Sequence, residues 1–264
     1  MKTRSIGPVV LCFADQGSGA PVVLVHGFPL DHTMWDAQID ALSVKYHVIA
    51  PDLRGFGRSS VTEGLITMDR FADDLADLLD ELHVSETITL CGLSMGGYVA
   101  FSFWKRHASR LRGLILCDTR SAGDTPEVAA GRLEMAQRVL REGPAPLVDT
   151  MMPKLFAQAT AQQHPDLVES LRRVMMGTDP RAIAAAARGM AQRPDVTDML
   201  AEIDCPTLVI VGEQDAISTA DEMRGIARRI ARARFVEIQG SGHMSPMEKP
   251  AEFSAAMSEF LGEL

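Results

Sequence analysis

Short apolar runs alternate with longer amphipathic stretches along residues 20–118. Apolar runs of three or four residues predict buried strands at residues 22–25, 48–50, 87–90 and 114–117. The stretches between them predict helices over residues 31–43, 68–82 and 95–107. This alternation predicts parallel strands joined by right-handed helical crossovers, which form a doubly wound α/β sheet. Ligands of such sheets bind at the carboxyl ends of the strands, so the chemistry is expected there.

The alternation stops after residue 118, and residues 120–200 contain no convincing strand. Four helices are predicted in this region, over residues 126–141, 145–158, 165–176 and 180–192. The sheet pattern then resumes with strands at 206–211 and 235–238 and helices at 219–230 and 250–261. We therefore expect a core made of residues 1–119 and 201–264, with a four-helix cap inserted over residues 120–200.

Methionines are frequent in the expected cap. Flexible thioether side chains can line an adaptable apolar pocket, but they serve equally well to pack helices together. The residues that could line a substrate pocket are Met151, Met152, Met175 and Met176, with Met190 in the last cap helix.

Composition narrows the class of protein. Of 264 residues, 46% are hydrophobic and 23% are charged, which is typical of a folded globular chain. The net charge of -9, without a cluster of basic and aromatic residues, argues against a nucleic-acid partner. No apolar run approaches the 18 residues of a membrane span, and the run at residues 9–14 is too short for a signal peptide. The four cysteines lack metal-binding spacing and are expected to be reduced core residues of a cytoplasmic protein.

A candidate nucleophile lies between a predicted strand and a predicted helix. The sequence there is Gly92-Leu93-Ser94-Met95-Gly96, a G-x-S-x-G turn. Such a turn holds its serine in a strained conformation above the sheet, and its glycines allow neighbouring segments to approach without a Cβ clash. The amide of Met95 at the helix start points into the same space and favours developing negative charge.

A serine nucleophile needs a base, usually a histidine oriented by a carboxylate. His243 is the best of the seven histidines, because it follows Gly240-Ser241-Gly242 in a loop between the last strand and the last helix. Asp215, in the loop after the strand at residues 206–211, is the favoured acid. Asp118 follows the strand next to the serine's own and is its rival. The order of Ser94, Asp215 and His243 is the order of the α/β-hydrolase triad.

A second donor for an oxyanion is expected at the end of the first predicted core strand. His26-Gly27-Phe28-Pro29 forms a glycine turn there, and the Phe28 amide would face the serine. His26 is expected to brace this loop rather than bind a metal. Asp52, in a glycine-rich segment, is expected to hold its own turn together.

Taken in order, these segments resemble the α/β-hydrolase family, and the likeness extends along nearly the whole chain. In detail the chain is similar to bacterial carboxylesterases close to the 3-oxoadipate enol-lactonases and the cofactor-free haloperoxidases. The resemblance implies a mostly parallel eight-stranded sheet with an inserted helical cap, a triad of Ser94, Asp215 and His243, and oxyanion donors Phe28 and Met95.

The expected activity is hydrolysis of short-chain carboxylic esters through an acyl-enzyme. It requires neither a metal nor an organic cofactor, and its partner is a small-molecule ester bound by a monomer or small homo-oligomer. A lactonase or a perhydrolase (haloperoxidase) is the alternative within enzymes, since cap residues set the acyl pocket. A ligand receptor without turnover is the alternative outside them, but no member of the triad is missing.

Overall fold

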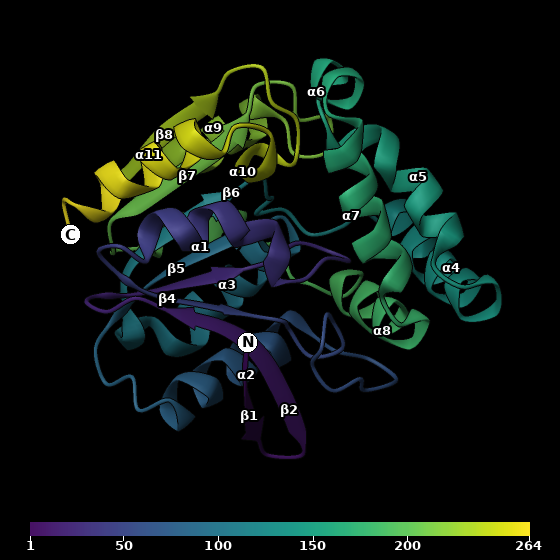
Figure 1. Ribbon diagram of the computed structural model, residues 1–264, viewed down its shortest axis with the longest axis horizontal. Helices are drawn as coiled ribbons and strands as arrows, with labels where there is room; N and C mark the ends of the chain where they lie inside the picture. The colour runs from purple at the N-terminus through teal and green to yellow at the C-terminus, as the bar shows by residue number, and fades with distance from the viewer.

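One eight-stranded sheet organises the computed structural model, which describes residues 1–264 (Figure 1). The strand order is β1-β2-β4-β3-β5-β6-β7-β8; β2 pairs antiparallel with β1 and β4, and all the other pairs are parallel. The prediction of a mostly parallel eight-stranded sheet is therefore confirmed. The strands are β1 (Lys2–Ile6), β2 (Val9–Gln16), β3 (Pro21–Val25), β4 (His47–Pro51), β5 (Ile88–Leu93), β6 (Leu111–Cys117), β7 (Thr207–Gly212) and β8 (Ala233–Ile238).

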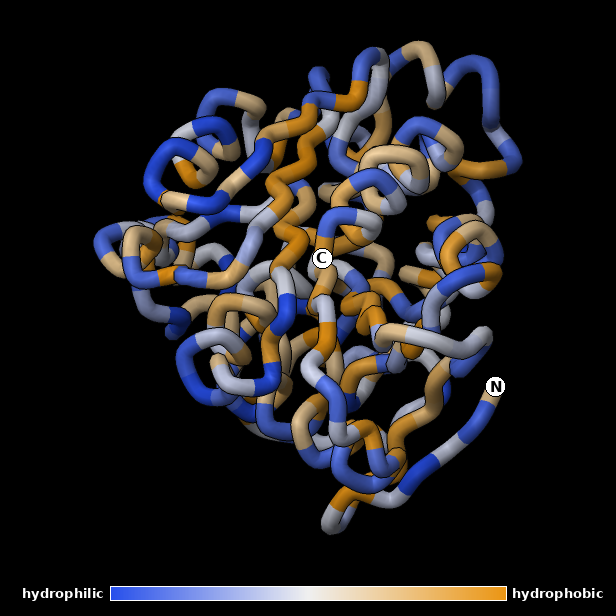
Figure 2. The backbone as a smooth tube through the Cα atoms, turned by 90° about the vertical axis from the view of Figure 1, so that its left-hand side faces the viewer, coloured by the Kyte–Doolittle hydropathy of each residue, from blue (hydrophilic) through white to orange (hydrophobic).

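Both faces of the sheet are buried, so its central strands read as continuous apolar runs. In β3, Val23 and Val25 join a hydrophobic cluster with α2, α3 and α9, whereas Val22 and Leu24 join a second cluster with α1 and α11. Figure 2 shows apolar segments running through the middle of the molecule. The helices that cover the sheet are α1 (Asp36–Leu42), α2 (Met68–Glu81), α3 (Met95–His107), α9 (Ala220–Arg229) and α11 (Pro250–Leu261).

One local feature was not predicted, and another differs from the prediction. The apolar run at residues 9–14 is part of β2, which pairs with β1 and β4. The helix predicted at 31–43 is divided into a 3-10 turn, η1 (His32–Trp35), and α1. The Asp31 carboxylate accepts a hydrogen bond from the Thr33 amide and so starts a tight turn there. Further short elements are η2 (Ala108–Arg110), η3 (Thr197–Glu202) and α10 (Ser245–Glu248).

Five α-helices, not four, lie between β6 and β7, and Figure 1 shows them grouped on one side of the sheet. The helix predicted at residues 145–158 ends at Leu155 because Phe156 adopts an extended backbone and buries its side chain. The next amide, of Ala157, donates to the Glu248 carboxylate, 2.9 Å away. The helices are α4 (Pro126–Glu142), α5 (Ala145–Leu155), α6 (Gln158–Gln163), α7 (Pro165–Gly177) and α8 (Pro180–Met190), here called the inserted helices.

The inserted helices pack directly on the sheet layer. Residues 182–187 of α8 are almost all alanine and are fully or nearly fully buried, so its backbone lies close to the loop before α2. The Ile66 amide donates to the carbonyl of Ala185 at 3.2 Å. A side chain at Gly189 would collide with the Ile66 carbonyl.

None of the helices combines the length and the apolar character needed to cross a membrane. The cysteines are free thiols; three are buried, as predicted, while Cys205 is half-buried at the start of β7.

Candidate active site

Ser94 lies between β5 and α3 with its backbone in the left-handed region, at φ 54°. Non-glycine residues adopt this conformation at a cost, and such strain is concentrated at functional sites. The glycines on either side permit the turn: a Cβ at Gly92 would collide with the Gly96 carbonyl, and a Cβ at Gly96 with the Val25 carbonyl. The strained turn therefore projects the serine from the edge of the sheet, as the sequence predicted.

The carboxyl ends of the central strands are level with one another. Val25 of β3 and Leu116 of β6 both pair with Gly92 of β5, so the loops after these strands meet at one edge. The loops after β7 and β8 join them, because Gly212 pairs with Ile238. This register brings residues far apart in the sequence to the same edge as Ser94.

His243 and Asp215 form a buried pair at that edge. His243 Nδ1 lies 2.8 Å from Asp215 Oδ2, and both side chains are almost fully buried. The other oxygen of Asp215 accepts hydrogen bonds from the amides of Ile217 and Ser218. Burial alone would raise the pKa of Asp215, but the charge of a protonated His243 and these hydrogen bonds hold that pKa below its usual value. The ionised carboxylate leaves Nε2 of His243 as the free nitrogen.

Asp118 has a different set of contacts. Its Oδ1 accepts from the Gly212 amide at 2.8 Å, and its Oδ2 accepts from the Ser245 hydroxyl at 2.6 Å. Burial and the neighbouring Asp215 charge raise the pKa of Asp118 well above its usual value. Asp118 therefore connects the loops after β6, β7 and β8, while Asp215 contacts the histidine.

Metal-ligand atoms of Asp118, Asp215 and His243 lie within 4.8 Å of one another, as do those of Asp31, His32 and Asp52. Hydrogen bonds from the protein already engage the carboxylates of Asp52, Asp118 and Asp215. Asp52 accepts from the amides of His32 and Arg58, and a side chain at Gly57 would collide with its carboxylate. These contacts fit the turn-holding role expected of Asp52.

The loop after β3 lies beside the serine turn, since a Cβ at Gly27 would lie 3.5 Å from the Cβ of Ser94. The backbone N–H of Phe28 donates to no protein acceptor, and Met95, as the first residue of α3, has no helical acceptor either. His26 fixes this loop: the Leu53 amide donates to its Nε2 at 3.0 Å, so its Nδ1 donates to the Gly27 carbonyl. Burial lowers the pKa of His26, which keeps the imidazole neutral.

Ser94 and His243 line one cavity of about 240 Å³ between the sheet edge and the inserted helices. No hydrogen bond joins their side chains, a common state of catalytic pairs without substrate. The sheet edge also contributes Phe28, Tyr98 and Ile217. The inserted helices contribute Arg132, Leu147, Thr150, Met151, Lys154 and Met190.

The structure separates the four methionines that the sequence grouped together. Of these four, only Met151 lines this cavity. Met190, the fifth methionine of the region, lines it as well. Met152 and Met175 pack into the hydrophobic cluster of the sheet, and Met176 is exposed. Helical periodicity alone does not tell a cavity-facing methionine from one packed against the sheet.

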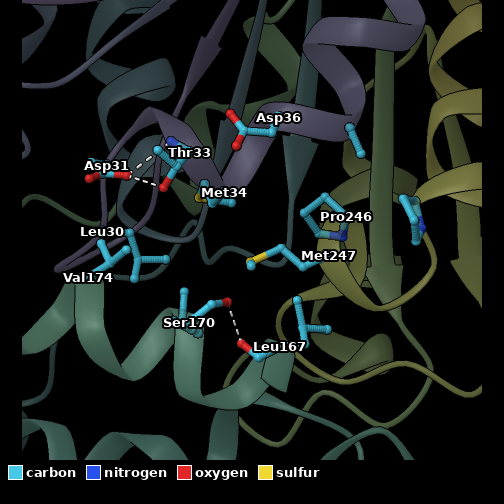
Figure 3. A pocket seen from close by; sticks show the side chains of 13 residues that line it. Leu30, Asp31, Thr33, Met34, Asp36, Leu167, Ser170, Val174, Pro246 and Met247 are labelled. Carbon is cyan, nitrogen blue, oxygen red and sulfur yellow. Dashed lines mark hydrogen bonds between the residues drawn. The ribbon is translucent and has the colours of Figure 1, made fainter. Parts of the chain in front are cut away.

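A larger cavity, of about 330 Å³, lies elsewhere, between α7 and the segment of η1 and α1 (Figure 3). Leu167 and Val174 of α7 face Met34 and Met247 across it, with Asp31 and Asp36 at its side. It contains neither Ser94 nor His243. The chemistry of the side chains, rather than size, identifies the smaller cavity as the candidate site.

The α/β hydrolase fold model matches residues 20–250 of the chain. The chain belongs to the α/β-hydrolase family. It is similar to a thermophilic esterase from Thermogutta terrifontis, whose malate-bound structure is 48% identical and superposes with a TM-score of 0.98, over 100% of this chain and 99% of that one.

Two sequence relatives lie further away. A 3-oxoadipate enol-lactonase from Acinetobacter baylyi is 30% identical, covering 97% of this chain and 94% of its own length. A non-heme chloroperoxidase from Kitasatospora aureofaciens is 30% identical, covering 97% of both chains. These matches confirm the predicted family branch, and they confirm an ester hydrolase as the class of enzyme.

Several functional candidates were not found from the sequence. Ser245 and Glu248 connect the histidine loop to its surroundings: Glu248 accepts from the Gly242 amide at 2.7 Å while also holding the end of α5 through Ala157. Arg132 and Lys154 reach the cavity from α4 and α5. No local motif marks these residues, because their positions depend on how the inserted helices pack.

Proposed function

We propose that this hydrolase is a serine carboxylesterase that cleaves short-chain carboxylic esters with Ser94, His243 and Asp215. The observation that carries the proposal is the shared cavity: a serine on a strained strand-to-helix turn lines the same cavity as a histidine whose Nδ1 is bound by a buried carboxylate. A nucleophile, a base and a group that orients the base are the three parts that acyl transfer requires.

In the first step, His243 Nε2 takes the proton of Ser94 as Oγ attacks the ester carbonyl. Asp215 stabilises the imidazolium that forms and keeps Nδ1 protonated. The amides of Phe28 and Met95 donate to the oxyanion of the tetrahedral intermediate, and loss of one such donor commonly costs about 100-fold or more in turnover. The Ser94 amide takes no part, because it donates to the Cys117 carbonyl.

The intermediate collapses when His243 returns the proton to the departing alcohol, which leaves the acyl group on Ser94. Water then enters, gives its proton to His243 and attacks the acyl carbon. The second tetrahedral intermediate releases the carboxylic acid and restores the serine hydroxyl. Every proton passes through a side chain of this chain.

In this proposal residues 120–200, which contain the inserted helices, form a cap over the active site. Residues 1–119 and 201–264 form the catalytic core. The cavity beneath the cap, about 240 Å³, is small beside the roughly 300–1,000 Å³ of ordinary small-molecule sites. A small cavity favours short acyl chains, because overfilling a packed site forces side chains out of their preferred conformations. Met151 and Met190 would contact the chain, and this role is not extended to Met152, Met175 or Met176.

A lactonase is the second candidate, favoured by the enol-lactonase relative that covers 97% of this chain. A lactone is a cyclic ester, so the same three side chains would open it while the alcohol stays attached to the acyl group. The chloroperoxidase relative raises perhydrolysis in the same way, with peroxide in place of water.

The test compares catalytic efficiencies on one enzyme preparation. p-Nitrophenyl esters from acetate to octanoate, a set of γ- and δ-lactones, and peracid formation from acetate and hydrogen peroxide would be measured beside Ser94→Ala. We expect the highest kcat/KM on acetate or butyrate esters. Higher efficiency on lactones would make the protein a lactonase, and activity equal to that of Ser94→Ala on every substrate would refute the proposal.

A further inference from the structure

The charged side chains that line the candidate active site are all basic. Apart from His243, the ionisable side chains that line the cavity at ordinary pH are Arg132 and Lys154, and no carboxylate lines it. The chain as a whole carries a net charge of -9, and the larger cavity beside α7 is lined by Asp31 and Asp36 without a cation. The charge of the catalytic cavity is thus opposite to that of the whole chain and of the cavity beside α7.

The arginine belongs to a group that retains a positive charge. Asp124 is shared by two guanidinium groups: Arg132 Nε lies 2.5 Å from its Oδ2, and Arg193 Nη1 lies 2.6 Å from its Oδ1. Burial would raise the pKa of Asp124, but the two arginines hold it below its usual value, so this carboxylate is ionised. Two cations on one anion leave one positive charge beside the cavity.

Arg132 also keeps a donor available. Its Nε and Nη2 are engaged by Asp124, but the only acceptor near Nη1 is the thioether sulfur of Met190, at 3.6 Å. A thioether is a weak acceptor. A carboxylate oxygen in the cavity would be a far better partner for this N–H, and charge-assisted hydrogen bonds of this kind are about twice as strong as neutral ones.

Lys154 supplies the second charge from the last turn of α5. It is exposed at the cavity wall, and none of the ion pairs of the molecule involves it. Its ammonium group is therefore free to turn toward a ligand. A fixed guanidinium on one helix and a mobile ammonium on the next could hold the two oxygens of one carboxylate.

We propose that the enzyme prefers esters that carry a carboxylate a few bonds from the scissile carbonyl, and that Arg132 and Lys154 bind this carboxylate. The inference rests on the proposed esterase function and adds the substrate class. Monoesters of short dicarboxylic acids carry the charge on the acyl side, and acyl derivatives of hydroxy acids carry it on the alcohol side. The chemistry that the two cations recognise is the same in both.

Matched substrate pairs separate charge from size. Monomethyl glutarate and methyl valerate differ only at the end of the acyl chain, where the first has a carboxylate and the second a methyl group. 4-Acetoxybutyrate and butyl acetate differ in the same way at the end of the alcohol chain. A pH-stat assay at pH 7 and low salt gives kcat/KM for all four. We expect the charged member of at least one pair to be favoured about tenfold or more, and the favoured pair identifies the side. High salt should reduce this preference.

Variants then assign the preference to the side chains. Lys154→Met should lower the charged-to-neutral ratio by about tenfold, mainly through KM, because a distant carboxylate is bound equally in the ground and transition states. Arg132→Gln should lower it as well, Lys154→Arg should retain it, and Lys154→Glu should lower it most. Lys45→Met is the control, since Lys45 is also exposed but lies outside the cavity lining.

Two results would overturn the substrate class while leaving the esterase intact: no preference in either pair for the native enzyme, or an unchanged ratio in both Lys154→Met and Arg132→Gln. The failure of the esterase itself would look different. In that case neither member of either pair would be cleaved faster by the native enzyme than by Ser94→Ala.

Discussion

The two walls of the cavity are built differently. The sheet edge holds Ser94 and His243 on short loops with buried hydrogen bonds, and the pair of His243 and Asp215 is almost fully enclosed. The wall of inserted helices presents longer side chains, among them the unpaired, exposed Lys154. In the proposed function the residues of the sheet edge carry out the reaction, and the residues of the inserted helices select the substrate. Substitutions on the two walls should therefore change different kinetic constants.

The largest effect is expected for Ser94→Ala. The methyl group fits the same turn, so the protein should fold, but no acyl-enzyme can form. Esterase turnover should fall to the level left by the oxyanion donors and binding alone, several orders of magnitude down. Steady-state assays with circular dichroism as a folding control measure this. Retention of more than a few per cent of activity, with contamination excluded, would remove the serine from the mechanism.

The next effect distinguishes the two acids. Asp215→Asn should lower kcat by about 10⁴-fold, as in the best-studied triad, because an amide does not hold His243 in the required tautomer. Asp118→Asn should be mild, since the amide keeps an acceptor for Gly212 and can donate to Ser245. Parallel kcat measurements on both variants test this order. The reverse ranking would assign the orienting role to Asp118.

Stability should respond to pH through Asp118. Because its pKa is raised, Asp118 in the folded state keeps a proton that the unfolded chain releases above about pH 4. The free energy of unfolding therefore falls as pH rises from about 4 toward the folded-state pKa of Asp118. Asp118→Asn removes that dependence. The free energy of unfolding of the variant should rise relative to the native protein by up to about 1.4 kcal/mol per pH unit within this window.

Urea unfolding at pH 4, 5.5 and 7 measures this difference. Asp215→Asn should flatten the same pH dependence, because the charge of Asp215 is one of the causes that raise the pKa of Asp118. A difference between native protein and Asp118→Asn that stays constant, or shrinks as pH rises, would mean that Asp118 is ionised in the folded state.

The smallest effect is expected on the helix wall. Met151→Ala enlarges the cavity near Ser94 and should move the preferred acyl chain upward by one or two carbons, with kcat on acetate esters changed only a few-fold. The exposed Met176 is the matched control, and Met176→Ala should leave the profile unchanged. A panel of p-nitrophenyl esters of increasing length measures both. An unchanged profile for Met151→Ala would place the acyl group away from α5.

The sequence predicted the strands and turns of the sheet edge well and the inserted helices poorly. The buried runs of β3, β5, β6 and β7 are continuous and apolar, and the loop motifs at Ser94 and His243 depend on local glycine geometry, so local signals were sufficient. The break at Phe156 was missed because the contacts there are not local: Phe156 is buried, and the next amide, of Ala157, donates to Glu248, 91 residues away. Lys154 and Arg132 were missed for the same reason. Whether these side chains reach the cavity depends on how the inserted helices pack, and local periodicity does not encode that packing.

The most direct test of the central claim is covalent trapping of the nucleophile. The native protein would be treated with a sulfonyl fluoride or an organophosphate and analysed by intact-mass and peptide mass spectrometry, with Ser94→Ala alongside. The account predicts one adduct per chain, located on Ser94, in step with complete loss of esterase activity, and no adduct on the variant. A stoichiometric adduct on any other residue, or full activity in protein labelled on Ser94, would contradict it.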